Sequence, residues 1–205
     1  MKILFTGGGT GGHFYPLIAV AEAMREQARK DKLLPPQFFF MSPSKYNPRA
    51  LFDNEITYIY VPAGKVRRYF SILNFTDTIV TAIGCLKALV GVYRIFPDIV
   101  FAKGGYTTFP TLWAARILRI PVIIHESDSS PGRVNLWASK FAEKIAISYP
   151  NSAEGFPLKT RSKIAYTGNP IRKEILIPIT TDVHSYFKID ESVPTILFLG
   201  GSQGS

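Results

Sequence analysis

A glycine-rich segment followed by a histidine is the strongest chemical signal near the start of the chain. Five of the six residues in Gly7–Gly12, the first glycine motif, are glycine, and His13 comes next. Backbone amides in such a segment, with a helix N-terminus behind them, can hold phosphate oxygens, because glycine lets the backbone approach closely. His13 is a candidate general base, since an imidazole titrates near neutral pH. The alternative is a polar residue at a helix start that bonds to the loop.

The first glycine motif also fits the pattern G-x-G-x-x-G at Gly7, Gly9 and Gly12. A nicotinamide-dinucleotide site would need an acidic residue near the end of the second strand to hold the ribose. That strand ends in Met41-Ser42-Pro43, which contains no acid. Five glycines also exceed what a structural turn needs. The motif therefore predicts a phosphate site and no dinucleotide cofactor.

A second glycine pair follows another apolar run. Lys103 precedes Gly104 and Gly105, the second glycine motif, and Tyr106 follows them. Two such motifs at one edge of a sheet would fit two phosphates, or one diphosphate held from two sides. The alternative is an ordinary turn in which Thr107 or Thr108 caps a helix.

Polar residues follow two later strands. His125-Glu126-Ser127-Asp128 comes directly after Val122-Ile123-Ile124, and Glu126 or Asp128 could orient a sugar hydroxyl or act as a base. A solvated loop with an Asx turn is the alternative. Gly168-Asn169-Pro170-Ile171-Arg172 is a turn sequence whose cation, Arg172, can contact a phosphate or a base carbonyl.

The chain carries a formal net charge of +9, which indicates an anionic partner. Lys65, Arg67 and Arg68 lie beside Phe70 and Leu73, a mixture that suits the surface of an anionic membrane. A solvated loop leading into a core helix is the alternative. The basic residues are otherwise scattered and no recognised nucleic-acid module is present, so nucleic acid is not expected.

Metal and redox chemistry find no support in the sequence. His13, His125 and His184 are far apart and lack metal-ligand spacing, so neither metal nor cofactor is predicted. The single cysteine, Cys85, is expected to be a buried small hydrophobe in a reducing compartment. The longest apolar stretch, Thr78–Phe96, is interrupted by Lys87 and Arg94 and is not expected to span a membrane. We therefore expect a cytoplasmic protein that can lie on a membrane surface.

Short apolar runs alternate with helix-like segments along the chain. This alternation predicts an α/β fold with a doubly wound, Rossmann-like parallel sheet and functional loops at the carboxyl ends of its strands. The expected strands are Lys2–Thr6, Gln37–Met41, Ile56–Val61, Asp98–Ala102, Pro121–His125, Lys144–Ile147, Lys163–Thr167 and Thr195–Leu199. The expected helices are Phe14–Lys30, Ile72–Phe96, Thr108–Leu118 and Asn135–Phe141.

The last part of the chain predicts the start of a second domain. A polar connector, Asp182–Pro194, precedes the expected strand Thr195–Leu199 and the glycine-rich turn Gly200–Gly204. A strand and turn without their helix cannot close a βα unit. The sequence therefore predicts one domain over 1–181 and the first strand and turn of another over 182–205.

Six motifs, taken in order, resemble the bacterial UDP-N-acetylglucosamine transferases of peptidoglycan synthesis in glycosyltransferase family 28. They are Gly7–His13 with Pro16, Lys103–Tyr106, His125–Glu126, Pro131–Gly132 with Asn135, Gly168–Arg172 and Gly200–Gly204. The resemblance implies a GT-B fold, in which two doubly wound domains face each other across a cleft. It also implies inverting transfer of N-acetylglucosamine (GlcNAc) from UDP-GlcNAc to lipid I, undecaprenyl-diphosphoryl-N-acetylmuramoyl-pentapeptide, without a metal held by a D-x-D motif.

The resemblance also implies roles for particular residues. The implied residues of the acceptor side and reaction centre are His13, Tyr106 and Glu126, as catalytic candidates, with Asn135. The other implied substrate-binding residues are Thr10, Gly11, Gly12, Gly104, Gly105, Asp128, Arg172 and Ser202. One departure is Asp128, where the family has asparagine. Aspartate keeps the acceptor oxygens but loses the amide donor and adds a charge.

The implied partners are UDP-GlcNAc, lipid I and the anionic inner face of the cell membrane, reached through Lys65, Arg67, Arg68, Phe70 and Leu73. The implied donor pocket lies mostly in a second domain, so we expect these 205 residues alone to turn over little. Two alternatives remain open at this point. One is another GT-B transferase or a UDP-sugar epimerase, and the other is a non-catalytic anion- or lipid-binding module.

Overall fold

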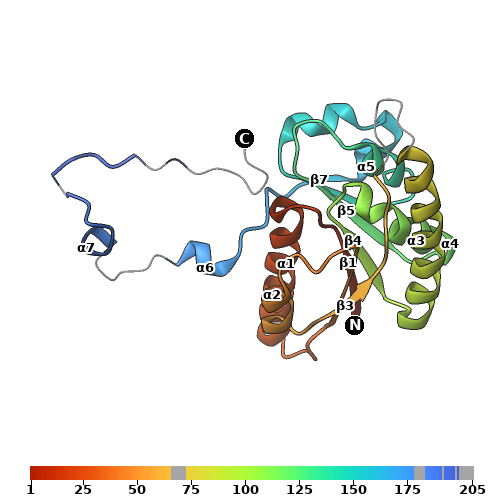
Figure 1. The fold of residues 1–205 in the computed structure, drawn as a ribbon, viewed down its shortest axis with the longest axis horizontal. Helices are drawn as coiled ribbons and strands as arrows, with labels where there is room; N and C mark the ends of the chain where they lie inside the picture. The colour runs from red at the N-terminus through yellow and green to blue at the C-terminus, as the bar shows by residue number, and fades with distance from the viewer. Residues whose placement is uncertain (66–72, 178–182, 191, 197, 199–205) are drawn as a thin grey trace.

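The computed structural model describes all residues except 66–72, 178–182, 191, 197 and 199–205. The described residues form a parallel sheet of seven strands in the order β3-β2-β1-β4-β5-β6-β7 (Figure 1). The strands are β1 Lys2–Thr6, β2 Gln37–Ser42, β3 Ile56–Tyr60, β4 Ile99–Ala102, β5 Val122–Glu126, β6 Lys144–Ile147 and β7 Ile164–Tyr166. The expected doubly wound fold is confirmed.

Helices cover both faces of this sheet. The covering helices are α1 Gly11–Lys30, α2 Pro48–Asp53, α3 Leu73–Ile95, α4 Phe109–Ile117 and α5 Arg133–Ala138. The short helices α6 Lys173–Leu176 and α7 Val183–Phe187 follow β7 along the chain and lie away from the sheet (Figure 1). The described residues also form the short 3-10 helices η1 Tyr106–Thr108, η2 Pro150–Gly155 and η3 Leu158–Lys163. α1 and α2 lie on one face, and α3, α4 and α5 lie on the other (Figure 1).

The side chains of β1 alternate between the two faces of the sheet, which explains why helices cover both faces. Ile3 and Phe5 pack with Leu17 of α1 in one core cluster, whereas Leu4 packs with Leu112 of α4 in the other. Successive side chains of a strand point to opposite faces, so a continuous apolar run needs apolar partners on both sides. The strand order reverses between β1 and β4, and ligands of such sheets bind at the carboxyl ends of the strands at this point.

Helix α3 is long and largely apolar. Phe75–Ile95 is long and apolar enough to cross a membrane by length and composition, although 28% of it is buried in the protein. We expected Lys87 and Arg94 to interrupt this stretch, but its mean hydropathy is high with both cations included, so whether it spans a membrane stays a prediction. α3 nevertheless joins β3 to β4 of one sheet and packs along α4, so it also serves as a covering helix.

Other differences from the expected elements are local. Residues 195, 196 and 198 are not in a strand, because a parallel strand needs a neighbouring strand to bond with, and the described residues provide none there. The expected polar connector contains α7. Helix α2 was missed, although Asn47 accepts a bond from the amide of Ala50 at its start. The boundary between 181 and 182 touches undescribed residues and stays a prediction.

Candidate active site

The first glycine motif lies at the carboxyl end of β1 and leads into α1. Gly8 has a φ of +130°, and a Cβ built there would lie 2.7 Å from Oγ of Ser42, so this position needs glycine. Gly11 and Gly12, which we expected in the loop, form the first residues of α1 after the N-cap residue Thr10. This first turn contains no acidic side chain, so the positive end of the α1 dipole is available to an external anion.

The second glycine motif lies beside the first, at the carboxyl end of β4. Gly104 has a φ of +87°, and a Cβ built there would lie 2.6 Å from Nδ2 of Asn135. A Cβ on Gly105 would lie 3.8 Å from Nε2 of His13, which brings the two motifs together around one imidazole. Thr108 donates its hydroxyl to the carbonyl of Gly105, at 2.8 Å, and so closes the turn before α4.

His13 is held by the residue that begins its own helix. Its Nδ1 lies 2.9 Å from Oγ1 of Thr10. Burial lowers the pKa of His13, the nearby charge of Lys103 lowers it further, and Asp128 and Glu126 oppose the shift. The imidazole is therefore neutral near pH 7. If Nδ1–H donates to Thr10, Nε2 keeps a lone pair and can accept a proton.

The carboxylate of Glu126, which is buried, holds the loop that follows β5. Oε1 accepts from the amide of Asp128 at 3.0 Å, and Oε2 accepts from the amide of Gly132 at 2.8 Å and from Nδ2 of Asn135 at 2.9 Å. Asn135, which is 2% exposed, also donates to the carbonyl of His125 at 3.3 Å. The structure thus places Glu126 and Asn135 behind the loop, where they fix its shape.

Asp128 is the exposed member of this group. Its amide donates to Glu126, and its carbonyl accepts from Oγ of Ser152 at 2.6 Å, so its backbone is fixed while its carboxylate faces solvent. The charge of Asp128 acts on both His13 and Lys103. An aspartate here therefore adds negative charge to the rim of the site.

Two buried residues at this edge were quoted in the motifs but not expected as site residues. Burial, and then Lys103, lowers the pKa of His125 to about 4, and its Nε2 lies 3.1 Å from the carbonyl of Gly168. His125 is thus a neutral link between β5 and the turn after β7. Lys103 is 1% exposed, and the sequence signal for it is a cation directly before a glycine pair.

Tyr106 and Arg172 line two different cavities near the carboxyl edge of the sheet. Tyr106, 40% exposed, lines a groove of about 530 Å³ with Phe109, Arg133 and Trp137. Arg172 shares a pocket of about 220 Å³ with Gly11 and Gly12.

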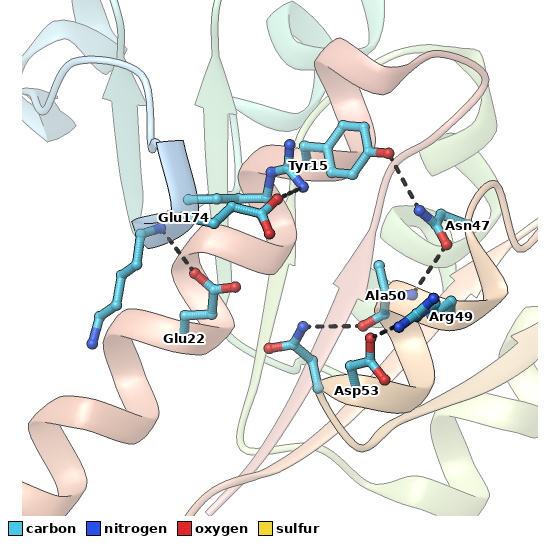
Figure 2. A network of polar contacts seen from close by, with 10 residues as sticks. Tyr15, Glu22, Asn47, Arg49, Ala50, Asp53 and Glu174 are labelled. Atoms are coloured by element: carbon cyan, nitrogen blue, oxygen red, sulfur yellow. Dashed lines mark hydrogen bonds and ion pairs between the residues drawn. The ribbon is translucent and has the colours of Figure 1, made fainter. Parts of the chain in front are cut away.

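The side chain of Arg172 is held in place by its neighbours. Its guanidinium lies 4.0 Å from the ring centroid of Tyr15 and pairs with Glu174. Asn47 donates to the hydroxyl of Tyr15 at 3.3 Å, as Figure 2 shows. The stacked arginine is therefore fixed beside the first turn of α1.

A family model described as the glycosyltransferase family 28 N-terminal domain matches residues 3–147. The chain belongs to glycosyltransferase family 28. A relative from Treponema denticola is 38% identical over 99% of this chain and 53% of its own length. A relative from Borrelia garinii subsp. bavariensis is 38% identical over 100% of this chain and 54% of its own length. Both are named UDP-N-acetylglucosamine--N-acetylmuramyl-(pentapeptide) pyrophosphoryl-undecaprenol N-acetylglucosamine transferase.

A solved structure agrees with this family assignment. The crystal structure of Acinetobacter baumannii MurG has a TM-score of 0.63 at 26% identity, covering 83% of this chain and 46% of that one. The chain spans about half the length of the curated relatives it matches. The family assignment therefore applies to a Rossmann-like domain that matches the N-terminal domain of this family.

Most residues implicated by the family 28 resemblance lie at one edge of the sheet. His13 and Gly105 approach each other, and the charges of Glu126 and Asp128 act on His13. Ser202 and the membrane candidates Arg67, Arg68 and Phe70 lie outside the described residues. Lys65 is exposed, and Leu73 begins α3. Among the described residues, no group of three or more metal-ligating side chains occurs.

Proposed function

We propose that this protein transfers GlcNAc from UDP-GlcNAc to lipid I, with inversion at the sugar, in peptidoglycan synthesis. The meeting of the two glycine motifs around His13 carries the proposal, because it combines two phosphate-binding backbones with a neutral base. Membership of family 28, and the names of relatives that are 38% identical, support the same substrates. A second domain of a GT-B fold would supply the rest of the donor pocket, including Ser202.

The proposed reaction is a single displacement at the sugar. The acceptor hydroxyl oxygen bonds to C1 of GlcNAc as the bond from C1 to the phosphate oxygen breaks. The hydroxyl proton passes to Nε2 of His13, and UDP leaves with the bonding electron pair. The first turn of α1 and the guanidinium of Arg172 would stabilise the negative charge on UDP. Asp128 and Tyr106 would orient the two sugars.

The hydrogen bonds at this edge favour His13 over Glu126 as the base. Three N–H groups donate to the carboxylate of Glu126, so both of its oxygens already accept hydrogen bonds. Nε2 of His13 faces the second glycine motif, where an acceptor diphosphate would be held. We therefore assign proton transfer to His13 and loop positioning to Glu126 and Asn135.

A lipid-linked acceptor requires contact with the membrane, and α3 supplies a suitable surface. Its outward residues, which we call the α3 face, are all at least 46% exposed: Phe75, Ile79, Ile83, Leu86, Val90 and Tyr93. An exposed apolar stripe of this kind is a typical interfacial surface. We propose that the α3 face and Lys65 contact the inner face of the cell membrane from the cytoplasmic side, with Arg67, Arg68, Phe70 and Leu73 contributing.

The test is transfer of labelled GlcNAc from UDP-GlcNAc to a lipid I analogue by the natural protein that contains this chain. We expect transfer to require the muramoyl sugar, so an otherwise identical prenyl diphosphate without it is the matched control. Transfer to lipid I alone supports the assignment. Absence of transfer by the folded protein, or equal transfer to both acceptors, would overturn it.

A further inference from the structure

Lys103 is buried without a hydrogen-bond partner among the described residues, although the charges of Glu126 and Asp128 act on it. It is 1% exposed, and its Nζ makes no hydrogen bond within the part of the chain that the structure describes. Burial lowers the pKa of Lys103 to about 8. A buried ammonium costs stability unless something compensates it. A methionine of similar length would fill the same space without that cost, so packing does not account for the charge.

The position of Lys103 relates it to both glycine motifs. It is the first residue after β4, and its amide donates to the carbonyl of Thr6 at the end of β1, at 2.9 Å. A Cβ built on Gly7 would lie 3.1 Å from Cβ of Lys103, so the side chain starts directly against the first motif. Gly104, of the second motif, is its chain neighbour. Lys103 therefore stands where the two motifs meet, beside the N-terminus of the 20-residue helix α1.

Two histidines and two carboxylates lie within electrostatic reach of Lys103. It acts on His13 of α1 and on His125, Glu126 and Asp128 at the end of β5. Both histidines have lowered pKa values and are neutral near pH 7, so neither offsets the charges of Glu126 and Asp128. An anion that approached the glycine motifs would be repelled by these carboxylates. Lys103 carries a positive charge that opposes them.

We propose that Lys103 is the fixed positive charge that gives the paired glycine motifs their affinity for a diphosphate group. The inference rests on the proposed function, in which such a group is bound at these motifs. Lys103 is a positioning residue: it acts from beneath the backbone, and the amides of the motifs contact the anion. Both the lipid acceptor and the UDP-sugar donor contain a diphosphate, so the experiment must separate these two sources.

The experiment measures binding of UDP and of farnesyl diphosphate to the natural protein by calorimetry near neutral pH. The variants are Lys103→Met, which removes the charge, and Lys103→Arg, which keeps it. Lys144→Met, at the amino end of β6, is the matched control for net charge. We expect Lys103→Met to lose about tenfold in affinity for one probe or both. Lys103→Arg and Lys144→Met should stay close to the natural protein.

The two probes identify the source of the diphosphate. Loss with farnesyl diphosphate alone assigns Lys103 to the acceptor, and loss with UDP alone assigns it to the donor. Equal binding by the natural protein and Lys103→Met would overturn the inference but leave the proposed function standing, because transfer is assayed separately. Failure of the natural protein to bind either probe would count against the diphosphate site itself.

Two further readouts separate an electrostatic role from a structural one. Affinity of the natural protein should fall as the pH rises from about 7 to about 9.5, relative to Lys103→Arg, because only the lysine loses its proton in that range. The ratio of the two proteins cancels the ionisation of the probe. Lys103→Met should also raise the melting temperature while it weakens binding. A melting temperature that falls, with an unchanged pH profile, would contradict the proposal.

Discussion

The carboxyl edge of the sheet and the α3 face depart from normal burial in opposite ways. At the edge, polar groups are inside: Lys103, His125 and Glu126 are each at most 4% exposed. On the α3 face apolar groups are outside, and Phe75 is 72% exposed. Both arrangements cost stability relative to an ordinary interior and surface. These costs are consistent with the proposed functions, which are anion chemistry at the edge and contact with an apolar environment on α3.

The largest effect expected at the edge comes from replacing His13. His13→Gln removes the proton acceptor but keeps a polar side chain that can bond to Thr10. We expect kcat for transfer to fall about 100-fold or more, with little change in KM, since the base acts in the chemical step. Steady-state transfer kinetics measure this. If His13→Gln kept most of its kcat, His13 would not be the general base.

Replacing Glu126 should cost mainly stability. Glu126→Ala leaves three N–H donors without an acceptor and Lys103 without an opposing buried charge. We expect the free energy of unfolding to fall by about 4 kcal/mol in denaturant titrations. Glu143→Ala, at an exposed position, is the matched control and should change it little. An unchanged stability of Glu126→Ala would show that the hydrogen-bonded loop is not a stabilising element.

The titration of Lys103 should make stability depend on pH in a defined direction. Its pKa is about 8 in the folded protein, against an ordinary value of 10.5, so the unfolded chain holds more protons between these values. Stability should therefore rise with pH from about 8 upward, by at most about 3 kcal/mol relative to Lys103→Met. Urea unfolding across this range measures the difference. A difference that stays flat would mean that Lys103 titrates normally.

The smallest effect on stability is expected on the α3 face. Leu86 is 64% exposed, so Leu86→Gln should change the free energy of unfolding by less than about 0.5 kcal/mol. The same change should weaken binding to anionic vesicles in a flotation assay. Leu158→Gln is the matched control, because Leu158 is 77% exposed in η3, away from α3. Equal vesicle binding by both variants would exclude the α3 face as the membrane contact.

The sequence predicted the sheet well because its strands are nearly continuous apolar runs, which signal burial on both faces. It also predicted which loops meet, since parallel strands bring their carboxyl ends to one edge. It did not predict that both carboxylate oxygens of Glu126 accept hydrogen bonds, because the donors Gly132 and Asn135 come from a later loop and helix. The sequence also did not predict that Nζ of Lys103 lacks a hydrogen-bond partner within the described part of the chain, because a local pattern does not show which groups surround a buried ammonium.

The sequence was less informative about surfaces and chain ends. The exposure of the outward side chains of α3 depends on which elements pack beside the helix. An apolar sequence pattern is the same whether a helix face is buried or exposed, so the sequence could not predict this exposure. The strand expected at Thr195–Leu199 had the right composition but found no strand to pair with. Helix α2 had a sequence signal in Asn47-Pro48, because an N-cap residue followed by proline at the first helical position is typical of a helix start.

We propose that the chemistry lies at the carboxyl edge of the sheet and the membrane contact lies on the α3 face. The most direct test compares transfer to one acceptor offered in two forms. A short-chain lipid I analogue is offered in solution, and the long-chain form is offered in anionic vesicles, to His13→Gln and Leu86→Gln. We predict that His13→Gln loses transfer equally on both forms, whereas Leu86→Gln loses it only on vesicles. If Leu86→Gln lost transfer equally on both, or if His13→Gln kept transfer in solution, the assignment of chemistry to the edge and of membrane contact to α3 would be wrong.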